Sequence, residues 1–407
     1  MEENFSAALK DIERIHKLSE KEMRAAELAD QAAEELAGSE FQHYLNHEVN
    51  PDYIRIAEKY GLFGLPISEE YGGSGSGLLS AVLVNQRFGQ LGLGFPTFYD
   101  VNIFIGASSL ARWGTEEQKS ACLKPLAHGK SIIAFGLTEP EAGSEPTAMK
   151  TTYTKEGSEY VLNGTKYLIT NGSIADHIII FAKSEEDGKS ITAFLVKTKE
   201  NGFSVEMNLH EKIGLFTSDT AMLRLENLHA EKENILGEEG KGMHVAYSAL
   251  LNGRLGIASG CIGVIEGSLK AAVSRAQERV QHGKLIGKHQ LIQRHIAEMR
   301  ENLEMARWPT YSAALRKSEY DKNPSDRTFT EEMDLRTALA KKIASRLAFE
   351  SADRAVQVYG GFGYSLLAPV GALFCDSRVS RIYEGTDEIL ELKIAEEVLG
   401  KDFEAFS

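Results

Sequence analysis

The feature that most constrains the fold is a strand-rich middle segment between two helix-rich ends. Short β-branched or aromatic runs fill residues 131–240, and turn signals such as Asn163-Gly164 and Asn171-Gly172 separate them. Many short strands at a spacing of roughly ten residues are typical of a β-barrel or sandwich. We therefore predict an α+β, mainly α chain with an N-terminal helical domain (1–130), a central β-barrel domain (131–240) and a C-terminal helical bundle (241–407).

The flanking segments carry a helical pattern. After Arg254, apolar residues recur every three or four positions, which predicts one buried face of a long helix. We expect that helix to stop at Gly283, because glycine is a common helix C-terminal signal. The polar stretch from Lys317 to Glu332 is expected to be an exposed loop.

Composition excludes several classes of protein. The 407 residues include 45 basic and 59 acidic side chains, and the net charge of −14 argues against nucleic acid as a partner. Three widely spaced cysteines indicate a reduced, cytoplasmic compartment and predict no metal site. Residues 1–10 lack the apolar core of a secretory signal, and the apolar runs are too short to predict a membrane span.

One carboxylate lies in a segment suited to general-base chemistry. In RIYEGTDEI, residues 381–389, Glu384 follows an apolar Ile-Tyr pair and precedes Gly385 and Thr386. Apolar walls can raise a carboxylate pKa from about 4.3 toward neutrality, as a general base requires. The same segment also fits a helix start, with Thr386 as N-cap and acids in the first turn. The two interpretations are compatible.

Four other motifs contain residues suited to binding a cofactor. FGLTEPEAGSE (135–145) offers hydroxyls and backbone amides for a heteroaromatic ring or a phosphate, and NGTKYLITNG (163–172) forms a hairpin and a strand. Arg279 in RVQHGK could bind a phosphate, and the glycines of QVYGGFGY (357–364) allow backbone to approach one. Each motif alone is better explained as an ordinary loop, a surface hairpin, a last-turn cation or a helix C-cap than as a cofactor site.

Taken together, these motifs resemble the acyl-CoA dehydrogenase family of flavoproteins. Their order, and the spacing of 27 positions from Gln357 to Glu384, match that family over essentially the whole chain. The resemblance implies a helical domain, a central β-barrel and a C-terminal four-helix bundle. It also implies FAD between the last two parts, partly across a subunit interface, in a homotetramer or dimer.

The resemblance also assigns roles to residues. Glu384 is implied as the catalytic base that takes the α-proton of an acyl-CoA thioester while the β-hydrogen leaves as hydride to flavin N5. The product is a trans-2-enoyl-CoA. Implied cofactor-binding residues are Phe135, Leu137, Thr138, Ser144, Leu168, Ile169, Thr170, Arg279, Gln290, Gln357, Gly360, Gly361, Thr386 and Glu388. Implied substrate-binding residues are Ser144, Arg254 and Gly385.

Two positions refine this expectation. Part of the family places its base on the long helix, next to the arginine that aligns with Arg254. Here that neighbour is Gly253, which favours Glu384. The tryptophan usual beside the flavin is Leu168.

The implied activity is acyl-CoA dehydrogenation in fatty acid and lipid metabolism, with electrons passed to electron-transfer flavoprotein. An acyl-CoA oxidase or an acyl-carrier-protein-linked dehydrogenase on the same scaffold is the alternative. A non-catalytic binding protein that kept the fold is a third hypothesis.

Overall fold

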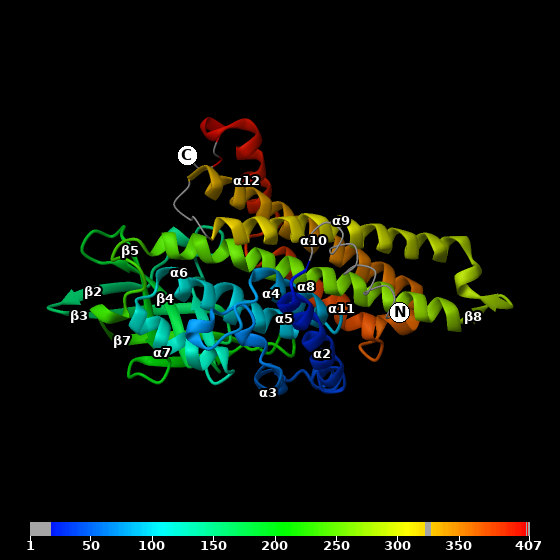
Figure 1. Ribbon diagram of the computed structural model, residues 1–407, viewed down its shortest axis with the longest axis horizontal. Coiled ribbons are helices and arrows are strands. Elements are labelled where there is room, and N and C mark those ends of the chain that lie inside the picture. Colours follow the sequence, from blue (N-terminus) through cyan, green and yellow to red (C-terminus); the bar gives the residue numbers. More distant parts are fainter. Residues whose placement is uncertain (1–17, 322–326, 404, 406–407) are drawn as a thin grey trace.

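The computed structural model describes residues 18–321, 327–403 and 405, arranged along one long axis with the sheet toward one end (Figure 1). The expectation about residues 1–10 lies outside the described residues. Ser19 and Thr115 form capping boxes that fix the starts of α2 and α7. The N-terminal helices are α2 (Glu20–Asn46), α3 (Asp52–Lys59), α4 (Leu78–Gly89), α5 (Gly94–Tyr99), α6 (Ser108–Trp113) and α7 (Glu116–Ala127). Between α5 and α6 the chain winds as a π-helix, η3 (Asp100–Ala107).

The middle of the chain is a curled sheet. Its strands are β1 (Ile133–Gly136), β2 (Thr152–Glu156), β3 (Glu159–Thr170), β4 (His177–Ser184), β5 (Ile191–Lys197), β6 (Phe203–Asn208) and β7 (Thr220–Glu231). They pair in the order β1-β4-β2-β3-β7-β6, with β5 on the other side of β4. No pairing among the described strands joins β6 back to β1 or β5, so the sheet is an open half-barrel and the predicted β-barrel is confirmed only in part. Bulges in the β3–β7 ladder, beside Gly164 and Ile169, add to its curl.

The rest of the chain is mostly helical. It contains α8 (Gly242–Glu278), the hairpin β8 (Val280–Gln281) and β9 (Lys284–Leu285), α9 (Gln290–Tyr320), α10 (Arg327–Tyr359), α11 (Pro369–Ser377) and α12 (Asp387–Leu399). Short 3-10 turns are η1 (Leu62–Gly64), η2 (Glu69–Tyr71), η4 (Pro146–Ala148), η5 (Lys232–Asn234), η6 (Ile286–Lys288), η7 (Gly360–Tyr364), η8 (Val379–Arg381) and η9 (Lys401–Phe403). Helices α8, α9 and α10 run side by side along the long axis (Figure 1). The prediction of a mainly helical chain with a strand-rich middle is confirmed.

Two local predictions were wrong. Helix α8 ends at Glu278 and not at Gly283, because His282 and Gly283, with φ values of 51° and 75°, turn the β8–β9 hairpin. The polar stretch 317–332 is helical at both ends, since α9 continues to Tyr320 and α10 begins at Arg327, while the prediction for residues 322–326 lies outside the described residues. The Lys317 ammonium is buried, pairs with Asp321 at 2.5 Å and lies 5.1 Å from the centre of the Tyr320 ring. Because the Lys317 charge is paired with a carboxylate and lies near an aromatic ring, this polar residue can be buried in the helical part of the protein.

Helix α8 connects the parts of the molecule, since it packs on α4, η3, β5, α9 and α10. A Cβ at Gly263 would lie 2.1 Å from the carbonyl oxygen of Gln86, so glycine lets α4 approach α8 closely. Contrary to the expectation that no apolar run is long enough, α8 has the length and composition of a membrane-crossing helix. Most of its apolar stretch is nevertheless buried inside the protein, as in a core helix.

Candidate active site

Glu384 lies on a strained turn just before α12. The Thr386 hydroxyl accepts a hydrogen bond from the Ile389 N–H at 3.3 Å, so the predicted helix cap is confirmed. Glu384 has a φ of 53°, and Gly385 follows with a φ of 94°. The left-handed region costs a non-glycine residue about 1–2 kcal/mol, and such strain clusters at functional sites.

The Glu384 carboxylate lies against Gly253 of α8. A Cβ at Gly253 would lie 2.5 Å from Oε2 and 3.0 Å from Cδ of Glu384, so a side chain there would displace the carboxylate. Oε2 is buried and has no hydrogen-bond partner among the described residues. Burial raises the pKa of Glu384 to about 7, and the positive charges of Arg254 and Lys341 oppose the rise. A half-buried carboxylate that has one buried, unpartnered oxygen and a near-neutral pKa is suited to act as a general base.

Lys341 of α10 holds the turn that carries Glu384. Its buried ammonium donates to the Gly385 carbonyl oxygen at 2.6 Å. Burial lowers the pKa of Lys341 to about 8, opposed mainly by the charge of Asp387. No sequence motif marked Lys341, because its role depends on the packing of α10 against a turn 44 residues later.

Arg254, predicted near the substrate, is anchored by an acid on α10. Its Nη1 lies 2.5 Å from Asp334 Oδ1, and Lys393 pairs with the other Asp334 oxygen at 2.8 Å. The Arg254 Nε is buried without a partner among the described residues. Sequence reasoning missed Asp334, whose contacts join residues 80 and 59 positions apart.

An apolar cluster joins the sheet to this region. It consists of Phe135, Val101, Ile105 and Ala249. The Ile105 Cδ1 atom lies 3.1 Å from the position that a Gly253 Cβ would take, so the cluster lies beside the Glu384 carboxylate. Phe135, predicted beside the cofactor, thereby comes near Glu384.

The first two cofactor motifs meet at the edge of the sheet. The Tyr167 N–H donates to the Thr138 carbonyl at 2.9 Å, which brings Leu137 and Thr138 beside the end of β3. The buried Lys166 ammonium donates to Glu139 Oε1 at 2.7 Å and to the Leu137 carbonyl at 3.4 Å. These contacts fix the loop that follows β1.

The end of β3 presents three of the predicted residues. Leu168 has a φ of 58° and is 48% exposed. Ile169 is buried, and Thr170 pairs with Thr220 as the last residue of β3. Ser144 is exposed on the loop after β1.

The other predicted cofactor residues lie elsewhere in the protomer. Arg279 and Gln290 flank the β8–β9 hairpin, at the end of the molecule opposite β2 and β3 (Figure 1). Their neighbours at that end include Gln357, Gly360 and Gly361, because the ends of α8 and α10 pack together there through Ala276 and Val358. All five are exposed. Thr386 and the exposed Glu388 lie at the start of α12, next to Glu384.

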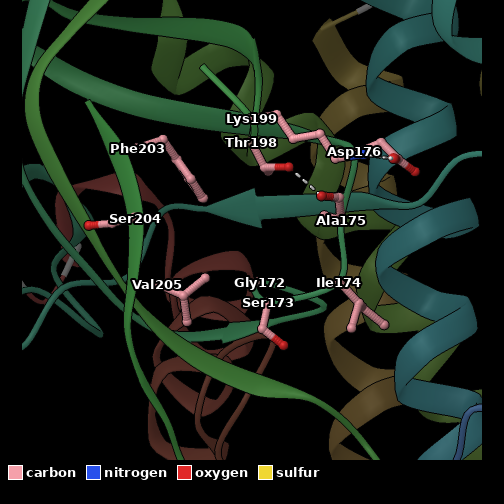
Figure 2. Close-up of a pocket in the computed structure, with 10 residues that line it drawn as sticks. All are labelled: Gly172, Ser173, Ile174, Ala175, Asp176, Thr198, Lys199, Phe203, Ser204 and Val205. Atoms are coloured by element: carbon pink, nitrogen blue, oxygen red, sulfur yellow. Dashed lines mark hydrogen bonds and ion pairs between the residues drawn. The ribbon is translucent and has the colours of Figure 1, made fainter. Parts of the chain in front are cut away.

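A hollow on the sheet contains none of the predicted residues. Figure 2 shows its lining, residues 172–176, 198–199 and 203–205. The Thr198 hydroxyl donates to the Ala175 carbonyl, and Lys199 lies 3.8 Å from Asp176 (Figure 2). Its polar groups are therefore already engaged. Among the described residues no cluster of His, Cys, Asp or Glu could hold a metal ion.

Comparisons with known proteins agree along the whole chain. The N-terminal, middle and C-terminal domains of acyl-CoA dehydrogenase match residues 19–130, 134–228 and 240–399. An acyl-CoA dehydrogenase of Bacillus subtilis is 36% identical over 95% of this chain and 100% of its own length. A subunit of the caffeyl-CoA reductase-Etf complex of Acetobacterium woodii is 37% identical, covering 84% of this chain and 88% of that protein.

A solved structure extends the agreement to three dimensions. Butyryl-CoA dehydrogenase from Megasphaera elsdenii superposes with a TM-score of 0.89 at 34% identity, covering 94% of this chain and 99% of that one. The chain belongs to the acyl-CoA dehydrogenase family.

Proposed function

We propose that this protein catalyses FAD-dependent α,β-dehydrogenation of a short-chain acyl-CoA thioester to a trans-2-enoyl-CoA, with Glu384 as the base. The observation that carries the proposal is the Glu384 Oε2 atom, which is buried against Gly253 and has no hydrogen-bond partner among the described residues. Similarity to butyryl-CoA dehydrogenase supports a short acyl chain.

The residues present fit FAD. The hydrogen bond from the Tyr167 N–H to the Thr138 carbonyl joins the loop after β1 to the end of β3, which carries Ile169 and Thr170, and we propose that the planar ring binds at this junction. Arg279 is exposed and forms no ion pair with any described residue, which suits an anionic diphosphate. Bound FAD supplies the acceptor for the β-hydrogen.

The proposed cofactor residues form two groups within one protomer. One group lies at the edge of the sheet formed by β1 and β3, and the other lies around the β8–β9 hairpin at the opposite end of the molecule (Figure 1). We propose that a second copy contributes the group containing Arg279, Gln290 and Gln357, within a homotetramer or dimer. Gly360 and Gly361 have open space around them and would let that copy's backbone approach the diphosphate.

The chain's own groups account for the proton transfer. Glu384 accepts the weakly acidic α-proton, and the apolar cluster of Phe135, Val101, Ile105 and Ala249 keeps water from the carboxylate. No described residue accepts a hydrogen bond from the Glu384 backbone N–H, so that donor is available to the thioester oxygen as negative charge develops there. Lys341 keeps the turn in place through Gly385. Arg254, Ser144 and Gly385 are proposed to contact the substrate.

The finer architecture is part of the same proposal. We assign domain boundaries at residues 1–130, 131–240 and 241–407, a four-helix bundle in the last domain, and a cytoplasmic location. Electron-transfer flavoprotein is the proposed acceptor, because a relative at 37% identity is named as a subunit of an Etf complex.

An anaerobic titration with acyl-CoA thioesters of increasing length tests the function. The purified protein should be yellow, and butyryl-CoA should bleach the flavin absorbance. The product should be crotonyl-CoA. A protein that stays colourless with added FAD, or a flavin that no thioester bleaches, would contradict the proposal.

An oxidase is the second candidate, favoured by the exposed Leu168 at the sheet edge, where the family usually has tryptophan. The test is turnover in air. Hydrogen peroxide formed at the full rate without electron-transfer flavoprotein would identify an oxidase. Bleaching by carrier-protein thioesters, but not by CoA thioesters, would identify the carrier-linked dehydrogenase.

A further inference from the structure

Asp100 is a second buried carboxyl group close to Glu384. It is the first residue of the π-helix η3 and is 1% exposed. Its Oδ1 is buried and has no hydrogen-bond partner among the described residues. Burial raises the pKa of Asp100 well above its usual range, and the charge of Glu384 acts in the same direction. π-Helical turns are rare and occur frequently at functional sites.

Both carboxyl groups lie over one face of α8. A Cβ at Gly256 would lie 1.8 Å from Asp100 Oδ1, just as a Cβ at Gly253 would lie 2.5 Å from Glu384 Oε2. Residues three positions apart on a helix share a face and are about 4.5 Å apart along its axis. The two glycines therefore make room for two carboxyl groups about one helical turn apart.

Apolar groups surround Asp100 Oδ1, and none of the described residues donates a hydrogen bond to it. The Phe104 ring lies 2.9 Å from the same Gly256 position, and the next residue, Val101, belongs to the apolar cluster beside Glu384. Other buried acids differ in this respect. Asp376, for example, accepts hydrogen bonds from the Leu215 and Leu93 backbone N–H groups. A buried carboxyl without partners is costly, so packing alone does not explain Asp100.

We propose that Asp100 binds a hydroxyl group on the acyl chain of the substrate, at the γ- or δ-carbon. This inference rests on the proposed function, because the chain reaches Asp100 only if its α-carbon lies at Glu384. The reacting carbon would lie about 3–3.5 Å from the Glu384 carboxylate. The next helical turn then places Asp100 a few bonds further along the acyl chain. A hydroxyl on the β-carbon would make the product the enol of a 3-oxoacyl thioester instead of a trans-2-enoyl thioester, so the proposed hydroxyl lies beyond the β-carbon.

A hydroxyl fits this position better than a cation. A protonated carboxyl group offers one donor and one acceptor, and a hydroxyl group offers the matching pair. An ammonium group would require Asp100 to be ionised about one turn from ionised Glu384, and like charges in a buried site oppose this.

Paired substrates test the inference. For pentanoyl-CoA and 5-hydroxypentanoyl-CoA, and for butyryl-CoA and 4-hydroxybutyryl-CoA, kcat/KM is measured from anaerobic flavin bleaching. The wild type should prefer the hydroxylated member of at least one pair by about tenfold or more, since an unmatched buried polar group penalises the plain chain. Asp100→Ala should abolish this preference. Asp100→Asn should keep part of it, because the amide retains a donor and an acceptor.

Val101→Ala is the matched control. It trims the neighbouring apolar side chain and should change both members of a pair alike. Flavin content and thermal unfolding verify that each variant folds. The ratio of kcat/KM between the two substrates of a pair is also measured on the wild type, so the test does not depend on any variant folding. A wild-type ratio near one for both pairs, or a preference that Asp100→Ala leaves unchanged, overturns the inference while dehydrogenation of plain thioesters stands. If neither member of any pair bleaches the flavin, the proposed function itself fails.

Discussion

Replacement of Gly253 by alanine tests the placement of the base directly. The new Cβ would lie 2.5 Å from Glu384 Oε2, whereas ordinary van der Waals contact begins at 3.4 Å. The carboxylate must therefore move by about 0.9 Å. A misplacement of about 1 Å can slow an enzyme about 100-fold, which corresponds to about 2.7 kcal/mol in the activation barrier.

The assay is the rate of flavin bleaching after rapid anaerobic mixing with butyryl-CoA. We expect Gly253→Ala to bind FAD, to be about 1–3 kcal/mol less stable from overpacking, and to bleach about 100-fold more slowly. Gly38→Ala is the control, because that helical position on α2 has open space around it. It should be slightly stabilised and fully active. Bleaching of FAD-loaded Gly253→Ala at the wild-type rate would refute the contact between Glu384 and Gly253.

Three further predictions follow from the same contacts. First, kcat/KM should fall about tenfold per pH unit below about pH 7, because Glu384 becomes protonated. Lys341→Met should move the midpoint of this fall to higher pH, because it removes a positive charge that lowers the Glu384 pKa. A profile of kcat/KM that is flat between about pH 6 and pH 8 would contradict this prediction. Second, Glu384→Gly combined with Gly253→Glu should recover part of the activity that Glu384→Gly loses, because the Cβ of the new side chain lies 2.5 Å from the position of the old Oε2 and glycine suits a φ of 53°. No recovery in a folded, FAD-loaded double variant would argue against this geometry. Third, Lys166→Met should lower the free energy of unfolding in urea by about 3–5 kcal/mol, because Glu139 is left buried without its counter-charge. A loss under about 1 kcal/mol would be inconsistent with a buried ion pair.

Local patterns in the sequence predicted the elements that depend on local chemistry. The Thr386 cap and the change from helices to strands follow from short-range propensities, and the structure has both. The end of α8 was mispredicted, because a glycine with positive φ serves equally as a helix cap and as a hairpin turn. The buried Lys317 was missed because its partners become visible only in three dimensions.

The candidate site, too, could be predicted from the sequence only where a local motif marks the residue. Glu384 stands in a recognisable motif, and Gly253 was noted only as a position that cannot supply a base. Its contact with the Glu384 carboxylate depends on the approach of α8 to the turn before α12, which no spacing encodes. Asp100 and Lys341 were not predicted at all, because each lies in a helix without a motif and acts through residues distant in sequence.

The most direct test of the central claim compares the wild type with Glu384→Gln, which keeps the shape of the side chain and removes the base. Both FAD-loaded proteins are mixed anaerobically with butyryl-CoA, and a shift of the flavin spectrum verifies that the thioester binds. We predict that the wild-type flavin bleaches, while the flavin of Glu384→Gln stays oxidised or reacts at least about 100-fold more slowly. Bleaching of the variant at the wild-type rate would show that Glu384 is not the base.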